Sequence, residues 1–160
     1  VIGAERAEST DYEAHRIEVG VPRGGLDFMC SDAFPHETNM DRLHGGDFDK
    51  GCYVGQEVVS RMEHRGTART RIVRLVLEGA PPEAGAAVAA ADKSVGVMGS
   101  SAAGHGLALL RLDRAADALD AGIPLIAGGI PIRLAEADDV KLLPKKTVAL
   151  PERHACMPTA

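Results

Sequence analysis

Cys52 is the residue best placed to do chemistry, because it stands between two glycines in the segment KGCYVGQE, residues 50–57. A thiolate is a nucleophile and a ligand for soft metals, so a cysteine on such a loop is a candidate reactive or catalytic thiol. The charge of Lys50 favours the thiolate, whereas Asp47 and Asp49 oppose it. A small buried cysteine without chemistry explains the position equally well, and both interpretations stay open.

A helix is expected to position this thiol. Its apolar face is predicted by residues that recur every fourth position, namely Val54, Val58 and Met62. On the opposite face Glu57 can pair with Arg61 one turn later, and Gly66 is a natural stop. Cys52 would then lie at or just before the first turn, where unpaired N–H groups and the helix dipole favour negative charge.

Arg16 is a second candidate for binding chemistry. Its guanidinium offers a planar set of donors that suits a carboxylate or the edge of a pterin ring. A surface ion pair with Glu13 or Asp11 is the commoner fate of an arginine on a helix, and it is the alternative.

The helix that carries Arg16 is predicted from its capping signals. Thr10 is the expected N-cap, with Glu13 as its capping-box partner. The helix should continue to about Val19, since Gly20 closes it and Pro22 prevents its extension.

The histidines and cysteines predict neither a metal site nor a disulfide framework. The histidines around the cysteine motif do not share a ligand spacing on one element: His36, His44 and His64. The cysteines are odd in number and far apart: Cys30, Cys52 and Cys156. A reducing compartment is therefore expected, such as the cytoplasm of a bacterium or the matrix of an organelle.

The composition excludes several classes of function. The 160 residues carry a formal net charge of −5 and only 3% aromatic residues, so direct binding of nucleic acid is not expected. Because no apolar run approaches the roughly 20 residues that span a bilayer, no membrane partner is expected either. The chain starts at Val1 rather than at a methionine, and we expect the N-terminal part of a larger protein to precede it.

The second half of the chain is predicted to be a small antiparallel β-barrel, because short apolar and β-branched runs alternate with glycine turns. The expected strands are residues 72–77, 86–89, 94–100, 107–112, 124–127 and 130–134. Gly128 and Gly129 predict a two-residue hairpin turn. A single helix is expected between the strands, with Asp113 as its N-cap and Gly122 as its stop.

The fold class is therefore α+β, in three parts. Residues 1–68 form a helical and loop portion, residues 69–143 the β-barrel, and residues 144–160 an extended tail.

The cysteine segment also carries a family resemblance. Residues 50–57 resemble the K-G-C-[FY]-x-G-Q-E signature of the YgfZ-type folate-binding proteins, which are relatives of the glycine-cleavage T-protein. The matching positions are Lys50, Gly51, Cys52, Tyr53, Gly55, Gln56 and Glu57. Residues 16–22 resemble the family's R-I-E-x-G-x-P element, and residues 34–39 its L-P-x-E-x-N element with Phe34 in place of leucine.

The resemblance extends into the predicted barrel. Residues 94–101 and 106–111 resemble the G-x-V-T-S-S and G-L-A-L-x-R elements of the family's C-terminal barrel. Met98 and Gly99 depart from that pattern. In all, the resemblance covers residues 12–134, most of the chain.

This resemblance implies that residues 1–68 are the C-terminal part of a folate-binding α+β domain. It implies tetrahydrofolate or a derivative as cofactor, with Arg16 and Glu37 as binding residues, although Glu37 alone would be an ordinary loop acid. The implied role is accessory: support of iron–sulfur cluster assembly or repair through the Cys52 motif. The implied partners are a reduced folate and iron–sulfur assembly or client proteins, with tRNA-modifying enzymes among the clients.

Two alternatives remain at this point. One is an enzyme, a folate-dependent aminomethyltransferase similar to the T-protein, although such enzymes typically carry a G-K-E-A-type helix start where this chain has its cysteine. The other is an interaction module in which Cys52 is structural. Taken together, the motifs favour an accessory protein over an enzyme.

Overall fold

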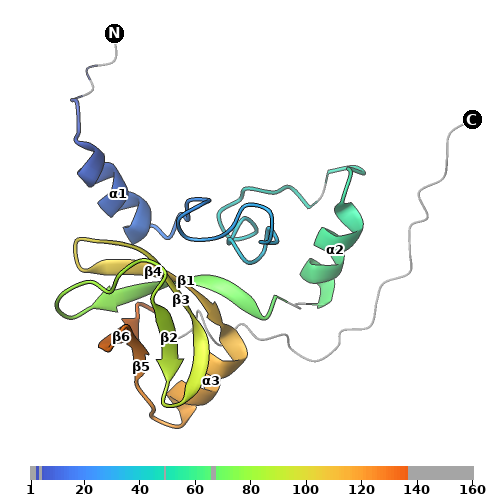
Figure 1. Cartoon of the computed structure of the whole chain (residues 1–160). Helices are drawn as coiled ribbons and strands as arrows, with labels where there is room; N and C mark the ends of the chain where they lie inside the picture. The colour runs from blue at the N-terminus through green and yellow to red at the C-terminus, as the bar shows by residue number, and fades with distance from the viewer. Residues whose placement is uncertain (1–2, 4, 49, 66–67, 137–160) are drawn as a thin grey trace, which may run out of the picture.

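The computed structural model describes residues 3, 5–48, 50–65 and 68–136 (Figure 1). Helix α1 (Ser9–Glu18) is followed by a long loop and helix α2 (Gln56–Arg65). Six strands and one helix follow: β1 (Thr70–Leu77), β2 (Ala87–Ala90), β3 (Lys93–Ala102), β4 (His105–Arg111), α3 (Leu112–Asp120), β5 (Leu125–Ala127) and β6 (Ile130–Leu134). The predicted helix stop Gly66, the predicted tail and Cys156 lie outside the described residues.

The six strands close into one antiparallel barrel in the order β1-β4-β3-β2-β5-β6. β1 pairs with β4 on one side, where Thr70 opposes Arg111, and with β6 on the other, where Leu77 opposes Ile132. Closure pairs every strand on both sides, so the main-chain donors and acceptors of the barrel satisfy one another. The predicted fold class, α+β with a small antiparallel β-barrel, is confirmed.

All six predicted strands are present, with ends displaced by at most two residues. The hairpin between β5 and β6 is also confirmed, because Ala127 pairs with Ile130 and leaves a two-residue turn. Gly128 and Gly129 have φ values of +55° and +86°, the left-handed pair that the favoured hairpin turn requires.

Apolar side chains of the strands fill the barrel, and α3 covers one end of it (Figure 1). The interior includes the almost completely buried Leu75, Val88 and Leu110. α3 contributes three buried side chains, each three residues after the last: Leu112, Ala115 and Ala118.

The predicted start of α3 was wrong by two residues. The N-cap is Arg111 rather than Asp113, which lies in the first turn and accepts a hydrogen bond from Arg111 at 2.6 Å. Strand β4 runs directly into this helix, so the carboxylate binds the preceding arginine and also accepts the Arg114 backbone N–H at 2.9 Å, from within the first turn. Gly122 follows the helix with φ +66°, as predicted.

The predicted start of α1 was also wrong by two residues. Glu8, not Thr10, is the N-cap, and its backbone N–H donates to the Asp11 carboxylate at 3.2 Å. Glu13, the predicted box partner, is engaged elsewhere with arginines. The C-terminal end is as predicted, with Gly20 at φ +76°.

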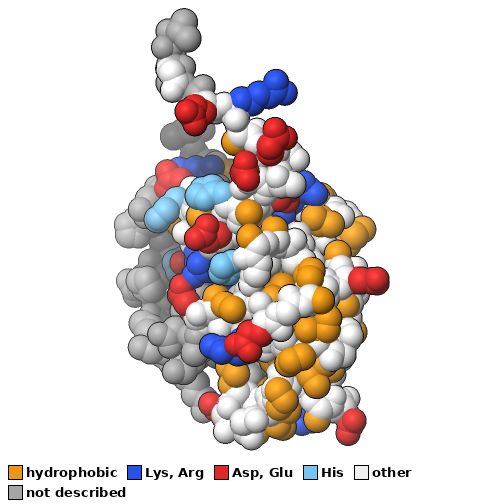
Figure 2. Space-filling view, turned by 90° about the vertical axis from the view of Figure 1, so that its left-hand side faces the viewer, with side chains coloured by type: hydrophobic (Ala, Val, Ile, Leu, Met, Phe, Trp, Pro, Cys, Tyr) orange, Lys and Arg blue, Asp and Glu red, His pale blue; other side chains and the backbone are white. Residues whose placement is uncertain are grey.

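α1 packs against the barrel through one apolar contact group. Ile17 packs with Ile72 of β1 and Leu107 of β4, and all three side chains are almost completely buried. The outer side of α1 is acidic. Figure 2 shows acidic side chains around this end of the molecule, and the exposed ones on and beside α1 include Glu8, Asp11 and Glu18. Within the described residues, none of the helices has the length and hydrophobicity needed to cross a bilayer.

Candidate functional site

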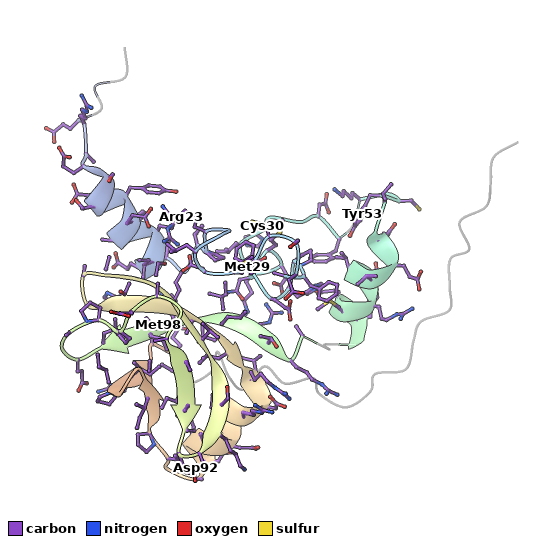
Figure 3. All side chains as sticks on the ribbon, in the orientation of Figure 1. Arg23, Met29, Cys30, Tyr53, Asp92 and Met98 are labelled. Carbon is purple, nitrogen blue, oxygen red and sulfur yellow. The ribbon has the colours of Figure 1, made fainter. Side chains whose placement is uncertain are left out.

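Residues 50–55 form a loop that leads into α2, with Tyr53 beside the start of the helix (Figure 3). Gln56 shapes this loop twice: its Oε1 accepts the Tyr53 backbone N–H at 3.3 Å, and its own N–H donates to the Tyr53 carbonyl at 3.2 Å. The Lys50 ammonium lies 4.9 Å from the centroid of the Tyr53 ring, within the range of a cation–π contact. Three residues of the motif therefore hold the loop that carries Cys52.

Cys52 does not lie at the helix start, contrary to the prediction. α2 begins only at Gln56, because Gly55 has φ +87°, a left-handed conformation that an α-helix cannot contain. The dipole acts within the first turn, so the cysteine four positions earlier is beyond its main effect. Val54, predicted on the apolar helix face, is fully exposed in the loop.

The thiol of Cys52 is exposed, which does not fit the interpretation as a buried packing residue. A Cβ built on Gly51 would meet no heavy atom within 4 Å, so the chain is open beside the thiol. On α2 itself the predicted ion pair is confirmed, with Arg61 Nη2 and Glu57 Oε1 at 2.5 Å. Both of these side chains are exposed, so the pair contributes at most about 1 kcal/mol to stability.

Arg16 is buried rather than on the surface, with 3% of its area exposed. Nε and Nη2 donate to Glu13 at 3.2 and 2.7 Å, and Nη2 also donates to the Ser100 hydroxyl at 2.9 Å. Nη1 donates to Asp27 at 2.9 Å and to the Val21 carbonyl at 2.7 Å. A guanidinium has five N–H groups, and all five are used here within the chain. A direct contact with a ligand would have to replace one of these bonds.

Burial by itself would lower the pKa of Arg16, but the hydrogen bonds and charges of Glu13 and Asp27 raise it above its ordinary value. These contacts therefore favour the charged guanidinium. Arg23, next to α1 in Figure 3, adds a further ion pair to Glu13 at 2.6 Å.

Asp27 connects the loop after α1 to the barrel, and sequence reasoning missed it. Its carboxylate accepts the Ser100 N–H and hydroxyl at 2.7 and 2.6 Å, and the Arg23 N–H at 2.8 Å. Gly99 permits this approach, since a Cβ there would lie 2.5 Å from Asp27 Oδ1. Asp27 and Ser100 are 73 residues apart, so no local pattern connects them. The unusual glycine at position 99 was the signal in the sequence that could have indicated this close contact.

Glu37 is half-buried in a loop turn that lies against β1. Its Oε2 accepts the Phe34 N–H at 2.9 Å, and its carbonyl accepts the Ile72 N–H at 2.9 Å. Oε1 has no hydrogen-bond partner among the described residues. In the same part of the chain, no hydrogen bond or ion pair joins Glu37 to Arg16, so the structure does not bring these two predicted residues into contact.

A hollow of about 260 Å³ lies between the end of α1, the loop and β1. It is lined by Val19, Gly20, Asn39, Arg42, Leu43, Ile72 and Arg74. None of the predicted residues Arg16, Glu37 and Cys52 lines it. Its size is below the range of about 300–1,000 Å³ that holds a ligand as large as folate.

No metal site was predicted, but the structure brings together one group of side chains that could hold a metal ion. His36, Asp41 and Glu63 bring one donor atom each to within 4.8 Å of one another. The sequence did not reveal this group, because its members come from a loop and from α2 and share no ligand spacing on one element.

Comparisons with known proteins point to one group of relatives. Residues 69–142 match the family model described as the CAF17 C-terminal beta-barrel domain. The iron–sulfur cluster assembly factor IBA57 homolog, mitochondrial, of Mycosarcoma maydis is 48% identical over 83 residues, 51% of this chain and 21% of that protein.

Two mammalian proteins named iron–sulfur cluster assembly factor IBA57, mitochondrial, are also similar. The Mus musculus protein is 36% identical over 107 residues, 63% of this chain and 30% of that protein. The Homo sapiens protein is 34% identical over 148 residues, 89% of this chain and 38% of that protein. The chain therefore spans less than two fifths of the length of each of these relatives.

Proposed function

Because residues 69–142 match the CAF17 C-terminal barrel and the similar proteins are named iron–sulfur cluster assembly factors, we propose that this chain acts in iron–sulfur cluster assembly or repair. The role is that of an accessory protein with iron–sulfur assembly or client proteins as partners. The relatives are named mitochondrial, and a reducing compartment, such as an organelle matrix, is the proposed location for this chain too.

The observation that carries the proposal is the exposed thiol of Cys52 on a loop held by its own motif residues. A thiolate is a good ligand for soft metals, and the open side at Gly51 leaves room for a partner to approach. An iron–sulfur cluster usually has four protein ligands, so one cysteine does not hold a cluster alone. We therefore propose a transient contact of Cys52 with iron, sulfur or a partner protein.

Tetrahydrofolate or a derivative is the proposed ligand of the complete gene product. Glu37 supports this, because a half-buried carboxylate with one oxygen left over can accept hydrogen bonds from the N–H groups of a pterin. Arg16 fits a direct contact less well, since all five of its N–H groups are used within the chain. Its proposed contribution to folate binding is to position α1 and the Asp27 loop.

An accessory role is proposed in preference to an aminomethyltransferase. The relatives are named assembly factors. In aminomethyl transfer the folate amine is itself the nucleophile, so the reaction does not call for an exposed thiol such as Cys52.

The proposal is tested by Cys52→Ala in the complete gene product, expressed in cells that lack their own assembly factor. Iron–sulfur enzyme activities should fall, whereas folate affinity measured by calorimetry should stay nearly unchanged. Cys30→Ala is the matched control, because Cys30 is also exposed but lies outside the motif, and it should remain active. Full activity of Cys52→Ala would refute the role of the thiol, and rescue of glycine cleavage by the wild-type protein would support the enzyme instead.

A further inference from the structure

The loop between α1 and α2 meets helix α2 at one polar cluster. His36 and Asp41 belong to the loop, and Glu63 belongs to the last turns of α2. His36 Nε2 lies 2.9 Å from Glu63 Oε2, and the three donor atoms lie within 4.8 Å of one another. Figure 1 shows α2 beside this loop and away from the barrel, so the cluster is at the place where α2 meets the rest of the chain.

The imidazole of His36 is buried and held in a fixed orientation. The side chain is 2% exposed, and its ring packs at 5.8 Å, centroid to centroid, on the ring of Phe48. Nδ1 is buried and has no hydrogen-bond partner among the described residues, so Nε2 is the only polar atom that orients the ring there. That atom points at Glu63, whose 42% exposure leaves an entry path from solvent.

Asp41 is presented to the cluster as a carboxylate. Arg71 donates to both of its oxygens, at 2.9 and 2.6 Å, and Arg71 is itself fixed by the Asn39 side chain at 3.2 Å. Burial tends to raise the pKa of Asp41, but the hydrogen bonds and charge of Arg71 bring it below its ordinary value. Each oxygen of the Asp41 carboxylate keeps a second lone pair that can coordinate a metal ion. Arg71 orients this carboxylate in the way that hydrogen-bonding neighbours orient the ligands of a metal site.

Two carboxylate oxygens and an imidazole nitrogen lie within 4.8 Å of one another, so a positive charge between them is favourable even with Arg71 paired to Asp41. A proton on Nε2 is the simplest solution and gives an ordinary histidine–glutamate pair. A metal ion is the second, and it competes with the proton for the same lone pair. One imidazole and two carboxylates form a donor set that suits Mn²⁺, Fe²⁺ and Zn²⁺, with coordination positions left for water.

We propose that His36, Asp41 and Glu63 bind a divalent first-row transition-metal ion, which fastens α2, and with it the Cys52 loop, to the loop that follows α1. The ion would join α2 to a loop segment more than 20 residues earlier in the chain, as a structural metal does. The proposal rests on these contacts alone and does not depend on the proposed function.

The test is a titration of the chain with Zn²⁺ by calorimetry, after the cysteines have been blocked with iodoacetamide so that thiolates do not compete. One ion should bind per chain. Glu63→Gln should weaken this binding by at least about tenfold, because it removes one of three ligands. Glu57→Gln is the matched control, since it changes a carboxylate of the same helix that is 82% exposed and paired with Arg61, and it should bind as the wild type does.

Two further measurements place the ion. In NMR spectra, paramagnetic Mn²⁺ should broaden the amide signals of His36, Asp41 and Glu63 first, and hydrogen exchange of α2 should slow when Zn²⁺ is present. The proposal is overturned if the wild type shows no saturable binding, if both glutamine variants bind alike, or if Mn²⁺ broadens other residues first.

Discussion

Arg16 and Asp27 form the most completely buried ion pair described in this chain. Their side chains are 3% and 1% exposed, and the charged atoms are 2.9 Å apart. Because every N–H group of the guanidinium and both oxygens of the carboxylate are hydrogen-bonded, the cost of burying the two charges is offset locally. At the scale of a residue, Arg16 is the buried polar link between α1 and the barrel, next to the apolar contact of Ile17.

Arg16→Ala is predicted to lower the free energy of unfolding by about 3–5 kcal/mol, because it leaves the Asp27 carboxylate buried without its cation. Urea unfolding followed by circular dichroism measures this loss. Arg61→Ala removes an exposed pair and should cost no more than about 1 kcal/mol. Equal losses in the two variants would show that the Arg16 pair is not structural and that its guanidinium is available to a ligand.

Strand β3 is the element that receives the Asp27 loop. Its pairing with β4 is irregular between Met98 and Ser101, so the Ser100 N–H is free of the ladder and donates to Asp27. Such irregularities commonly redirect a strand's groups toward a neighbouring segment. Gly99 lies within this stretch, and its missing side chain makes the space that the carboxylate occupies.

Gly99→Ala is predicted to destabilise the chain by about 1–3 kcal/mol, because the added methyl group would lie 2.5 Å from Asp27 Oδ1, a carboxylate oxygen that Ser100 holds in place. Thermal unfolding of the variant provides the measurement. Gly46→Ala is the control, since a Cβ at Gly46 would meet nothing within 4 Å. A Gly99→Ala variant as stable as this control would mean that Asp27 does not need its close approach to β3.

At the scale of the whole molecule, one apolar core lies within the barrel and α3, and a second, smaller one joins the barrel to α1. The main core draws on residues 73–132, so its members do not depend on the first 68 residues. The smaller core consists of Ile17 against Ile72 and Leu107.

A fragment of residues 69–136 is predicted to fold alone into the barrel, with a β-type circular dichroism spectrum and a cooperative thermal transition. It should be less stable than the whole chain, because exposing the surface under Ile17 costs about 1.5–3 kcal/mol. The same comparison with Ile17→Ala in the whole chain isolates that contact. A fragment without a cooperative transition would show that the first 68 residues are part of the barrel's folding unit.

Acid is predicted to destabilise the folded chain through Asp41. The pKa of Asp41 is lowered in the folded state, chiefly because the hydrogen bonds of Arg71 outweigh burial, which acts to raise it. A group of this kind stabilises the fold above its unfolded value of about 3.9, and this contribution is lost as the pH falls through the folded value. The free energy of unfolding, measured with a chelator present, should therefore drop below about pH 4. Asp41→Asn should show a shallower drop, whereas Asp32→Asn, an exposed acid, should follow the wild type.

The sequence by itself determined the barrel, its hairpin and the existence of the three helices found in the described residues. Apolar alternation and glycine turns are local properties, so the six strands could be located to within two residues. Helix starts were less predictable, because Glu8 and Arg111 became N-caps through the direction in which the chain enters each helix. The KGCYVGQE motif was visible as well, although the conformation of Gly55 that separates Cys52 from the helix was not.

Only the tertiary structure decided what the candidate residues do. Arg16 reaches Ser100 across 84 positions, and His36 reaches Glu63 across 27. Periodicity and motifs do not predict contacts between residues so far apart in the sequence, because these contacts depend on how a closed barrel and an irregular loop fold against each other. Burial then sets the chemistry. It uses up the donors of Arg16 inside the chain, leaves Cys52 at the surface, and brings two carboxylates to within 4.8 Å of an imidazole nitrogen.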